Sequence, residues 1–243
     1  MQFECEGLAD FYNVIPNILL SAEKVCPRGI ETRELIAPQI KINNPRSRLA
    51  LCEGRDFSLS LAVMESILLF TKTNEIKYTI AINKNAAQFS DDGRTFYGAY
   101  GYRIAGSILK LIYKLRDDQD TRQAVLPIMQ VGDMSAITKD VPCTLALNFM
   151  IRNNKLNLIV YMRSNDVIWG LPYDVYAFTT MQEIIANSLG LELGYYIHCP
   201  SSLHVYSNHY ETLELMANAK AQTQINRCGW ADWNLLCRGY RIL

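Results

Sequence analysis

The chain has 243 residues, of which 49% are hydrophobic and 20% are charged, and its formal net charge is zero. This length is enough for one large domain with a buried core or for two small ones. The charge balance gives no electrostatic reason to expect nucleic acid or a membrane surface as a partner, and no apolar run approaches the roughly 18 residues that span a bilayer.

The seven cysteines are odd in number and scattered, and no two are spaced as Cys-x-x-Cys. This pattern argues against a disulfide framework and against a structural zinc site. Because no charged-then-apolar leader opens the chain, we expect reduced thiols in a cytoplasm. Each cysteine is then either a small buried side chain of the core or a nucleophile. The seven are Cys5, Cys26, Cys52, Cys143, Cys199, Cys228 and Cys237.

Periodic segments follow one another without an internal repeat or a Gly/Ser linker, so a single domain over residues 1–243 is expected. In chain order they are a strand over 32–42, a turn over 43–48, a helix over 58–71, a helix over 103–116, a hairpin of two strands within 145–162, a helix over 175–189, strand-like sequence over 192–206 and a helix over 211–225. This order predicts an α+β domain with one substantial sheet covered by helices.

Two residues stand out from these elements. Cys143 follows a proline at the start of a strand, where a free cysteine is most often a small buried apolar side chain. A nearby arginine such as Arg163, one hairpin strand away, would instead lower the pKa of the thiol and supply a thiolate. Glu65 lies within an apolar helix, where an unpaired buried carboxyl has a raised pKa that suits proton transfer, unless it lies on the solvent face.

The segment SLHVYSNHY places His204, Tyr206 and His209 along a strand as hydrogen-bonding groups. They form no His-x-His arrangement with a carboxylate, so no metal site is expected.

Four short motifs, "PC" at 142–143, "RSND" at 163–166, "GLP" at 170–172 and "HVYSNH" at 204–209, together resemble the thymidylate synthase family over roughly residues 28–210. The resemblance implies a single thymidylate synthase-like catalytic domain. It also implies a large mixed β-sheet covered by helices, a sheet face that forms a homodimer interface, and 5,10-methylenetetrahydrofolate as co-substrate without a metal.

The same resemblance assigns roles to residues of this chain. Cys143 would add to carbon 6 of a pyrimidine nucleoside monophosphate, and Glu65 would move protons and position a water. The substrate-binding residues would be Arg28, Arg163 and Ser164 at the phosphate, His204 and Tyr206 at the ribose, and Tyr100 before the long helix. Asp166 would contact the folate and Gly170 would open the tight turn beneath the base.

Two of these assignments depart from the family pattern. Arg122 would reach across the dimer to the phosphate bound by the partner. Gln123 stands where a second arginine is usual, which implies fewer contacts with that phosphate. The family's Tyr-Gly pair is matched by Tyr100-Gly101, with residues 97–98 as the alternative register.

Three further departures concern the substrate. Thr144 replaces the usual histidine, Asp174 replaces the usual asparagine, and the tail that ends in "GYRIL" is short. All three look like the deoxycytidylate hydroxymethylase branch of the superfamily, whereas "GLPY" is nearer the synthase form.

The chemistry of Asp174 supports that branch independently. An ionised carboxylate only accepts hydrogen bonds, so it suits the amino group at position 4 of cytosine and repels the oxygen of uracil. The alternative role is a helix N-cap, because Asp174 precedes a predicted helix.

These residues predict hydroxymethylation of carbon 5 of dCMP or CMP. Water rather than hydride would complete the reaction, because residues 78–89 lack the tryptophans that shield the intermediate in synthases. The alternatives are a thymidylate or 5-methylcytidylate synthase, and a non-catalytic nucleotide-binding homologue.

Overall fold

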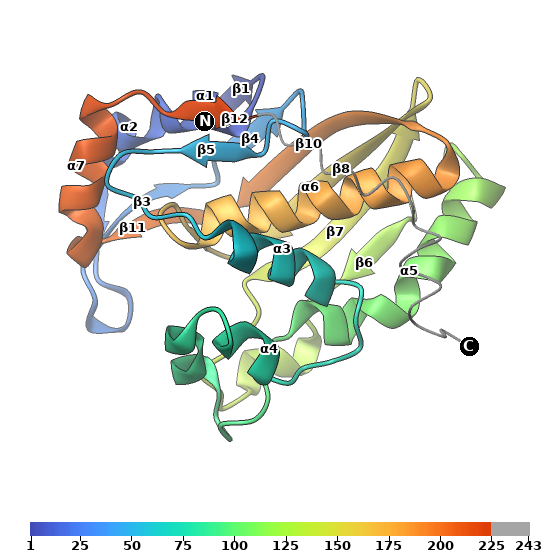
Figure 1. The fold of residues 1–243 in the computed structure, drawn as a ribbon, viewed down its shortest axis with the longest axis horizontal. Coiled ribbons are helices and arrows are strands. Elements are labelled where there is room, and N and C mark those ends of the chain that lie inside the picture. Colours follow the sequence, from blue (N-terminus) through green and yellow to red (C-terminus); the bar gives the residue numbers. More distant parts are fainter. Residues whose placement is uncertain (225–243) are drawn as a thin grey trace.

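The computed structural model of the protein describes residues 1–224 (Figure 1). Cys228, Cys237 and the "GYRIL" tail lie outside the described residues. The strands are β1 (Gln2–Cys5), β2 (Glu23–Val25), β3 (Thr32–Ile36), β4 (Gln39–Ile42), β5 (Leu49–Leu51), β6 (Val125–Pro127), β7 (Thr144–Arg152), β8 (Lys155–Met162), β9 (Asn165–Asp166), β10 (Glu192–Pro200), β11 (Ser202–Tyr206) and β12 (Gln222–Gln224). The α-helices are α1 (Leu8–Tyr12), α2 (Ile15–Leu20), α3 (Leu59–Leu68), α4 (Lys77–Ile80), α5 (Tyr100–Asp117), α6 (Gly170–Leu189) and α7 (Tyr210–Asn218). Short 3-10 helices are η1 (Pro27–Gly29), η2 (Lys84–Phe89), η3 (Val131–Ser135) and η4 (Ser207–His209).

The described strands form three sheets. The largest has six strands in the order β1-β4-β10-β8-β7-β6, and it is mixed, because β10 pairs parallel with β8 but antiparallel with β4. A second sheet has the order β2-β3-β11-β9, and β5 pairs with β12. The expected α+β fold with a large mixed sheet covered by helices is confirmed, although strands expected in one sheet are divided between two.

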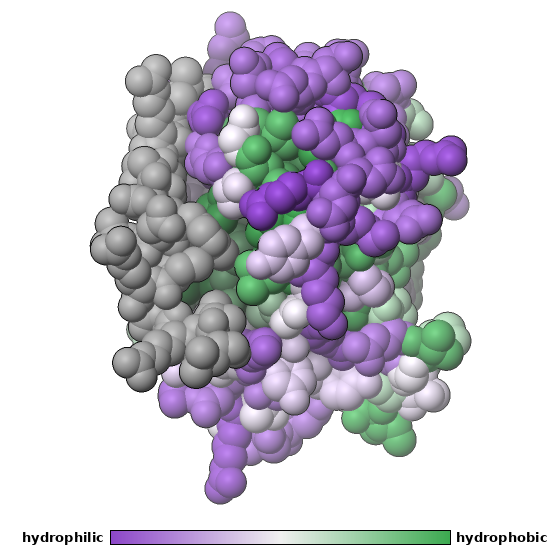
Figure 2. Space-filling view, turned by 90° about the vertical axis from the view of Figure 1, so that its right-hand side faces the viewer, coloured by the Kyte–Doolittle hydropathy of each residue, from purple (hydrophilic) through white to green (hydrophobic). Residues whose placement is uncertain are grey.

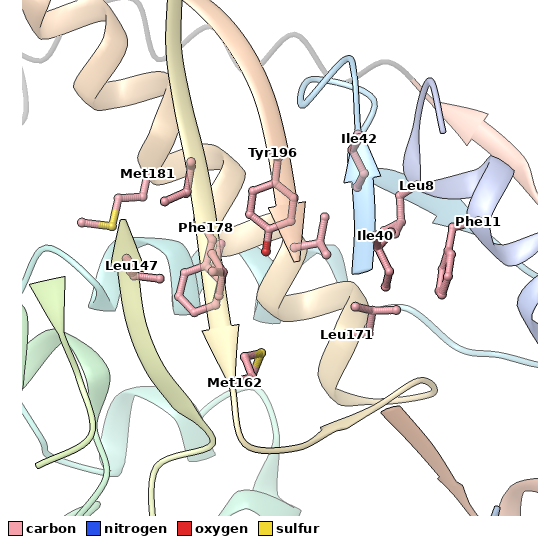
Figure 3. Packing of buried hydrophobic residues seen from close by; sticks show 14 of the residues in the cluster. Leu8, Phe11, Ile40, Ile42, Leu147, Met162, Leu171, Phe178, Met181 and Tyr196 are labelled. Carbon is pink, nitrogen blue, oxygen red and sulfur yellow. The ribbon is translucent and has the colours of Figure 1, made fainter. Parts of the chain in front are cut away.

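The core lies between the six-stranded sheet and α6, which crosses the sheet in Figure 1. Apolar side chains from both elements meet there, including Phe178 and Met181 of α6 and Leu147 of β7, with Leu8 and Phe11 of α1 beyond one edge (Figure 3). Nearly every residue from 171 to 186 is buried. A helix that is buried around its whole circumference is held by its surroundings on all sides, which makes α6 a rigid support.

Three of the predicted elements agree closely with the structure. The hairpin is formed by β7 and β8, whose turn residues Asn153 and Asn154 both have positive φ, as a two-residue hairpin turn requires. The helices over 58–71 and 103–116 correspond to α3 and α5.

Three other predictions were wrong in their boundaries. The expected strand over 32–42 divides into β3 and β4 of different sheets, because Ala37 has φ 48° and Pro38 follows it. The strand-like stretch over 192–206 also divides between two sheets, as β10 and β11. The helix expected over 211–225 ends at Asn218, before β12.

The surface viewed from the right-hand side of Figure 1 is mainly hydrophilic, with smaller hydrophobic areas between (Figure 2). Within residues 1–224, no helix is both long and apolar enough to cross a membrane.

The start of α5 packs directly on the end of α3. A Cβ atom added at Gly101 would lie 1.8 Å from the carbonyl oxygen of Leu68 and 2.8 Å from that of Thr71. Because both obstacles are backbone atoms, the two helices can approach this closely only with glycine at position 101.

We therefore predict that Gly101→Ala lowers the free energy of unfolding by about 1–3 kcal/mol, measured by urea denaturation, since the helices must separate. Gly106→Ala in the same helix is the matched control. Its added Cβ would meet only the flexible end of Lys72 at 3.3 Å, so helix propensity should raise stability by up to about 1 kcal/mol. Equal effects of the two substitutions would contradict this account of the packing.

Candidate active site

A cavity of about 350 Å³ lies where α3, α5 and α6 meet the segment that precedes β7. Four residues predicted for the site line it, namely Glu65, Tyr100, Cys143 and Asp174. They come from four separate segments of the chain, so the fold brings together residues that are far apart in sequence. Other lining residues come from 73–99 and include Asn74, Glu75, Phe89 and Phe96, which the sequence reasoning did not single out because that stretch lacks a clear period.

Arg163 holds the segment that carries Cys143. Its Nε donates to the carbonyl oxygen of Pro142 at 2.9 Å and its Nη2 to that of Val141 at 2.9 Å. Its backbone N–H also donates to the carbonyl oxygen of Cys143 at 2.8 Å. The Ser164 hydroxyl donates to Cys143 Sγ at 3.8 Å. The Arg-Ser pair therefore fixes the position of the thiol.

The pKa of the Cys143 thiol is raised, chiefly because the side chain is buried. The positive charge of Arg163 and the hydrogen bond from Ser164 lower it, and the acidic groups of Asp174 and Asp140 raise it further. The expected lowering by the guanidinium is present, but desolvation outweighs it and keeps the pKa of the thiol above its ordinary value.

Two carboxyl groups in the cavity have strongly raised pKa values. Burial, with the charge of Asp174, raises the pKa of Glu65 to about 8. Burial raises the pKa of Asp174 to about 7, although a hydrogen bond from Asn165 opposes the shift. Both side chains are half-buried at the cavity wall, so Glu65 does not lie on an exposed face of α3. Both groups can hold or release a proton near neutral pH.

Asp174 is the fifth residue of α6, which begins at Gly170 and has Trp169 as its N-cap. The alternative role of Asp174 as an N-cap is therefore wrong, because the helix starts earlier than its apolar period suggested. Residues 170–172 likewise form the first turn of α6 and not a separate tight turn. Gly170 packs against the Asn165 amide, where an added Cβ would lie 2.8 Å from Nδ2.

A buried hydrogen-bonded chain connects Asp174 to the six-stranded sheet. Asn165 Nδ2 donates to Asp174 Oδ2 at 2.7 Å, Asn165 Oδ1 lies 3.1 Å from His198 Nε2, and His198 Nδ1 lies 2.8 Å from the Tyr196 hydroxyl. Sequence reasoning missed Asn165, His198 and Tyr196. The sequence signal that could have identified His198 is a polar, titratable residue within an apolar strand, just as Glu65 is a titratable residue within an apolar helix.

A second group of predicted residues lies around β11. His204 pairs with Asp166 of β9, and its ring lies 4.9 Å from that of Tyr206. Burial, more than any charge, lowers the pKa of His204, and the positive charge of Arg28 lowers it further. Asp166 uses both carboxyl oxygens to accept from the N–H groups of Ile168 and Trp169, so in this structure it shapes the turn before α6. The segment 163–166 links this group to the Cys143 loop.

Arg122 is not brought to the cavity of its own chain. It follows the C-terminal end of α5, whose first residue, Tyr100, lines the cavity. A helix of 18 residues is about 27 Å long. Tyr100 is also the better register for the Tyr-Gly pair, since Tyr97 instead donates its hydroxyl to Asp133 at 2.9 Å.

No group of three or more metal-ligating side chains occurs within residues 1–224. His209 instead accepts a hydrogen bond from the Trp169 indole at 3.0 Å.

The thymidylate synthase family model matches residues 9–227. A deoxyuridylate hydroxymethyltransferase of Bacillus phage SP01 is 34% identical over 218 residues, which cover 82% of this chain and 57% of that protein. A protein of the same description from Pseudomonas phage M6 is 31% identical over 186 residues, covering 73% of this chain and 53% of the relative. The chain thus spans about half the length of these curated relatives. The solved structure of thermostable thymidylate synthase A from Bacillus subtilis has the same fold, with a TM-score of 0.74 at 21% identity over 89% of this chain and 86% of that one.

The geometry around Cys143 predicts that Arg163→Gln raises the pKa of the thiol, because the neighbouring positive charge is lost. Alkylation of Cys143 by iodoacetamide at pH 8, followed by peptide mass spectrometry, should slow by about three- to tenfold. Arg163→Lys keeps the positive charge, so it should slow the alkylation of Cys143 less. Exposed Cys26 in the same samples is the internal control. An unchanged or faster reaction of Cys143 in Arg163→Gln would contradict the role of the guanidinium.

Proposed function

Because the chain belongs to the thymidylate synthase family, we propose that it is a folate-dependent one-carbon transferase that modifies carbon 5 of a pyrimidine nucleoside monophosphate. The observation that carries the proposal is the convergence of Cys143, Glu65, Tyr100 and Asp174 on one cavity. Apolar walls that include Phe89 and Phe178, with polar Asn74 and Asp140, suit a flat, partly polar ring such as that of 5,10-methylenetetrahydrofolate. When bound, the folate supplies the one-carbon unit.

Cys143 is the proposed nucleophile. Its thiolate adds to carbon 6 of the pyrimidine, which makes carbon 5 nucleophilic toward the one-carbon unit. The thiol must first lose its proton, and the positive charge of Arg163 favours that loss. Glu65 has a pKa of about 8 and so is largely protonated at neutral pH, which allows it to give a proton to the ring and to hold a water.

The remaining assignments follow the family resemblance. Arg28, Arg163 and Ser164 would bind the phosphate through charge-assisted hydrogen bonds. His204 and Tyr206 would hold the ribose, and Asp166 would meet the folate beside the turn that it caps. Gly170, at the start of α6, would shape the folate and base side of the site.

We propose cytidylate, either dCMP or CMP, as the substrate. Asp174 lines the cavity near Cys143, and its ionised form can only accept hydrogen bonds. It therefore matches the amino group at position 4 of cytosine. A carboxylate facing the uracil oxygen would leave two acceptors in contact, which is costly in a buried site.

Hydroxymethylation is the proposed outcome. The curated relatives from two phages are described as hydroxymethyltransferases, which supports this class of product. The cavity wall over residues 73–89 contains Thr73, Asn74, Thr79 and Asn83 and no tryptophan, so a water can be hydrogen-bonded there. After carbon 5 has taken up the one-carbon unit, loss of its proton and departure of tetrahydrofolate would leave an exocyclic methylene. Water would then add to this methylene, and departure of the Cys143 thiolate from carbon 6 would give the 5-hydroxymethyl nucleotide.

Uridylate is the second candidate substrate. The two phage relatives are described as acting on deoxyuridylate. A protonated Asp174 carries both a donor and an acceptor, as an asparagine amide does, and so matches uracil. Because the pKa of Asp174 is about 7, both forms are available near neutral pH.

A homodimer is part of the proposal. The face of the large sheet opposite α6 presents partly exposed apolar residues, among them Ile159, Tyr161 and Ile197. A second copy covering this face could also supply Arg122 to its partner's phosphate, at a distance from its own cavity. The free thiols of Cys5, Cys26, Cys52, Cys143 and Cys199 fit a reducing cytoplasm.

The reaction is tested by incubating the protein with methylenetetrahydrofolate and CMP, dCMP or dUMP, with products identified by mass spectrometry. We expect 5-hydroxymethylcytidylate without the dihydrofolate absorbance that accompanies methyl transfer. Cys143→Ala should abolish turnover, whereas Cys26→Ala, which changes an exposed thiol, should not. Turnover of dUMP to dTMP, with none on cytidylates, would refute the proposal.

Replacing Asp174 by asparagine should move the preference toward dUMP. The amide can donate to the uracil oxygen, so we expect the ratio of kcat/KM for dUMP over dCMP to rise by about ten- to a hundredfold. The measurement is a competition assay with both nucleotides at pH 7.5. A ratio that does not change would show that Asp174 does not read the base.

A further inference from the structure

Four buried or half-buried polar side chains lie in one hydrogen-bonded row behind the base-reading position. Tyr196 and His198 are fully buried on β10, Asn165 is 3% exposed on β9, and Asp174 lies on α6 at the cavity wall. The heavy-atom distances along the row are 2.8, 3.1 and 2.7 Å. Only Asp174 among the four lines the cavity, so the other three act through it.

The buried end of this row determines which atom donates and which accepts in each of its hydrogen bonds. Within residues 1–224, the partner of the Tyr196 hydroxyl is His198 Nδ1, so the phenol hydrogen must be donated to that nitrogen or remain unpaired. Burial lowers the pKa of His198 to about 3, so the ring is neutral and carries one hydrogen. That hydrogen is then on Nε2, which donates to Asn165 Oδ1, and the Asn165 amide group donates to Asp174 Oδ2.

Gly170 keeps the last of these bonds in place. A side chain at position 170 would meet Asn165 Nδ2 at 2.8 Å, while Asp174 Oδ2 lies 3.8 Å from the same point. Asp174 Oδ2 is therefore committed as an acceptor. The other carboxyl oxygen, Oδ1, has no hydrogen-bond partner among the described residues.

We propose that Tyr196, His198 and Asn165 are positioning residues that confine any proton of Asp174 to Oδ1, so that this one proton decides whether the site accepts uracil or cytosine. The inference rests on the proposed function, because it assigns the base preference of the same site. With the proton on Oδ1, the carboxyl donates to the oxygen at position 4 of uracil. Without it, Oδ1 accepts from the amino group of cytosine.

Several titratable groups face Asp174 from the elements packed around it. They are Glu65 of α3, Tyr100 of α5, Cys143 before β7, and Tyr196 and His198 of β10. The pKa values of Tyr100, Cys143 and Tyr196 are raised and that of His198 is lowered, so these four keep their charge state between pH 5.5 and 8. Of these five groups, only Glu65 titrates near this pH range, with a pKa of about 8.

The test is the binding of dCMP and dUMP to the full chain by calorimetry between pH 5.5 and 8. We expect the ratio of Kd for dUMP over dCMP to rise with pH by up to about tenfold per pH unit across this range, because each nucleotide binds one protonation form of Asp174. Titration of the nucleotide phosphate falls in the same range but cancels in the ratio, because both ligands carry it. Asp174→Asn should give a ratio that favours dUMP and does not depend on pH.

Tyr196→Phe tests the row itself. Without the phenol hydrogen, His198 can adopt either tautomer and Asn165 can turn, so the proton of Asp174 can also occupy Oδ2. We expect the slope of the ratio against pH to fall below half its value in the unmodified protein. Tyr195→Phe is the matched control, because Tyr195 is the adjacent residue on the other face of β10, and it should keep the full slope. Thermal unfolding of both variants shows whether they fold.

Glu65→Gln removes the other carboxyl that titrates near this range, and the slope should persist. Loss of the slope in Glu65→Gln, or a full slope in Tyr196→Phe, would overturn the inference. If the unmodified protein binds both nucleotides with a ratio that is constant in pH, this inference fails while the proposed function stands. If it binds neither nucleotide, the proposed function fails as well.

Discussion

The hydrogen bond from Asn165 to Asp174, 2.7 Å long, is the contact on which the geometry of the site depends. It joins the short strand β9, which pairs with β11, to the first turns of α6, and Gly170 leaves room for it. The Tyr12 hydroxyl holds the same segment by donating to the carbonyl oxygen of Val167 at 2.7 Å. Because α6 is buried on all sides, a residue fixed near its start is held firmly relative to the sheet.

Two carboxyl groups in the cavity have different pKa values because their surroundings differ. Glu65 has a pKa of about 8 and no ion-pair partner among residues 1–224, whereas Asp174 has a pKa of about 7 and receives one amide hydrogen bond. A pair of acidic groups with different pKa values can serve different purposes at one pH. Glu65 is suited to hold and deliver a proton, and Asp174 to read the base through one oxygen.

Several residues predicted for the site lie close together in the structure, whereas the sheets were predicted less well. Glu65 was identifiable because it breaks an apolar helical pattern, and Cys143 and Asp174 were assigned through the motifs that resemble the family; the structure brings all three to one cavity. The partition of residues 32–42 and 192–206 between two sheets was not predictable from alternation, because the strand period is the same in both sheets. The row from Asn165 to Tyr196 was missed because its members become neighbours only when β9, β10 and α6 pack together.

The central claim is that Asp174 reads position 4 of the base through Oδ1. A crystal structure of the protein with dCMP bound tests this claim most directly. We expect the amino nitrogen of cytosine within hydrogen-bond distance of Asp174 Oδ1, carbon 6 facing Cys143 Sγ, and the Asn165 amide still bonded to Oδ2. A cytosine bound in this cavity with its amino group away from Asp174 would contradict the claim.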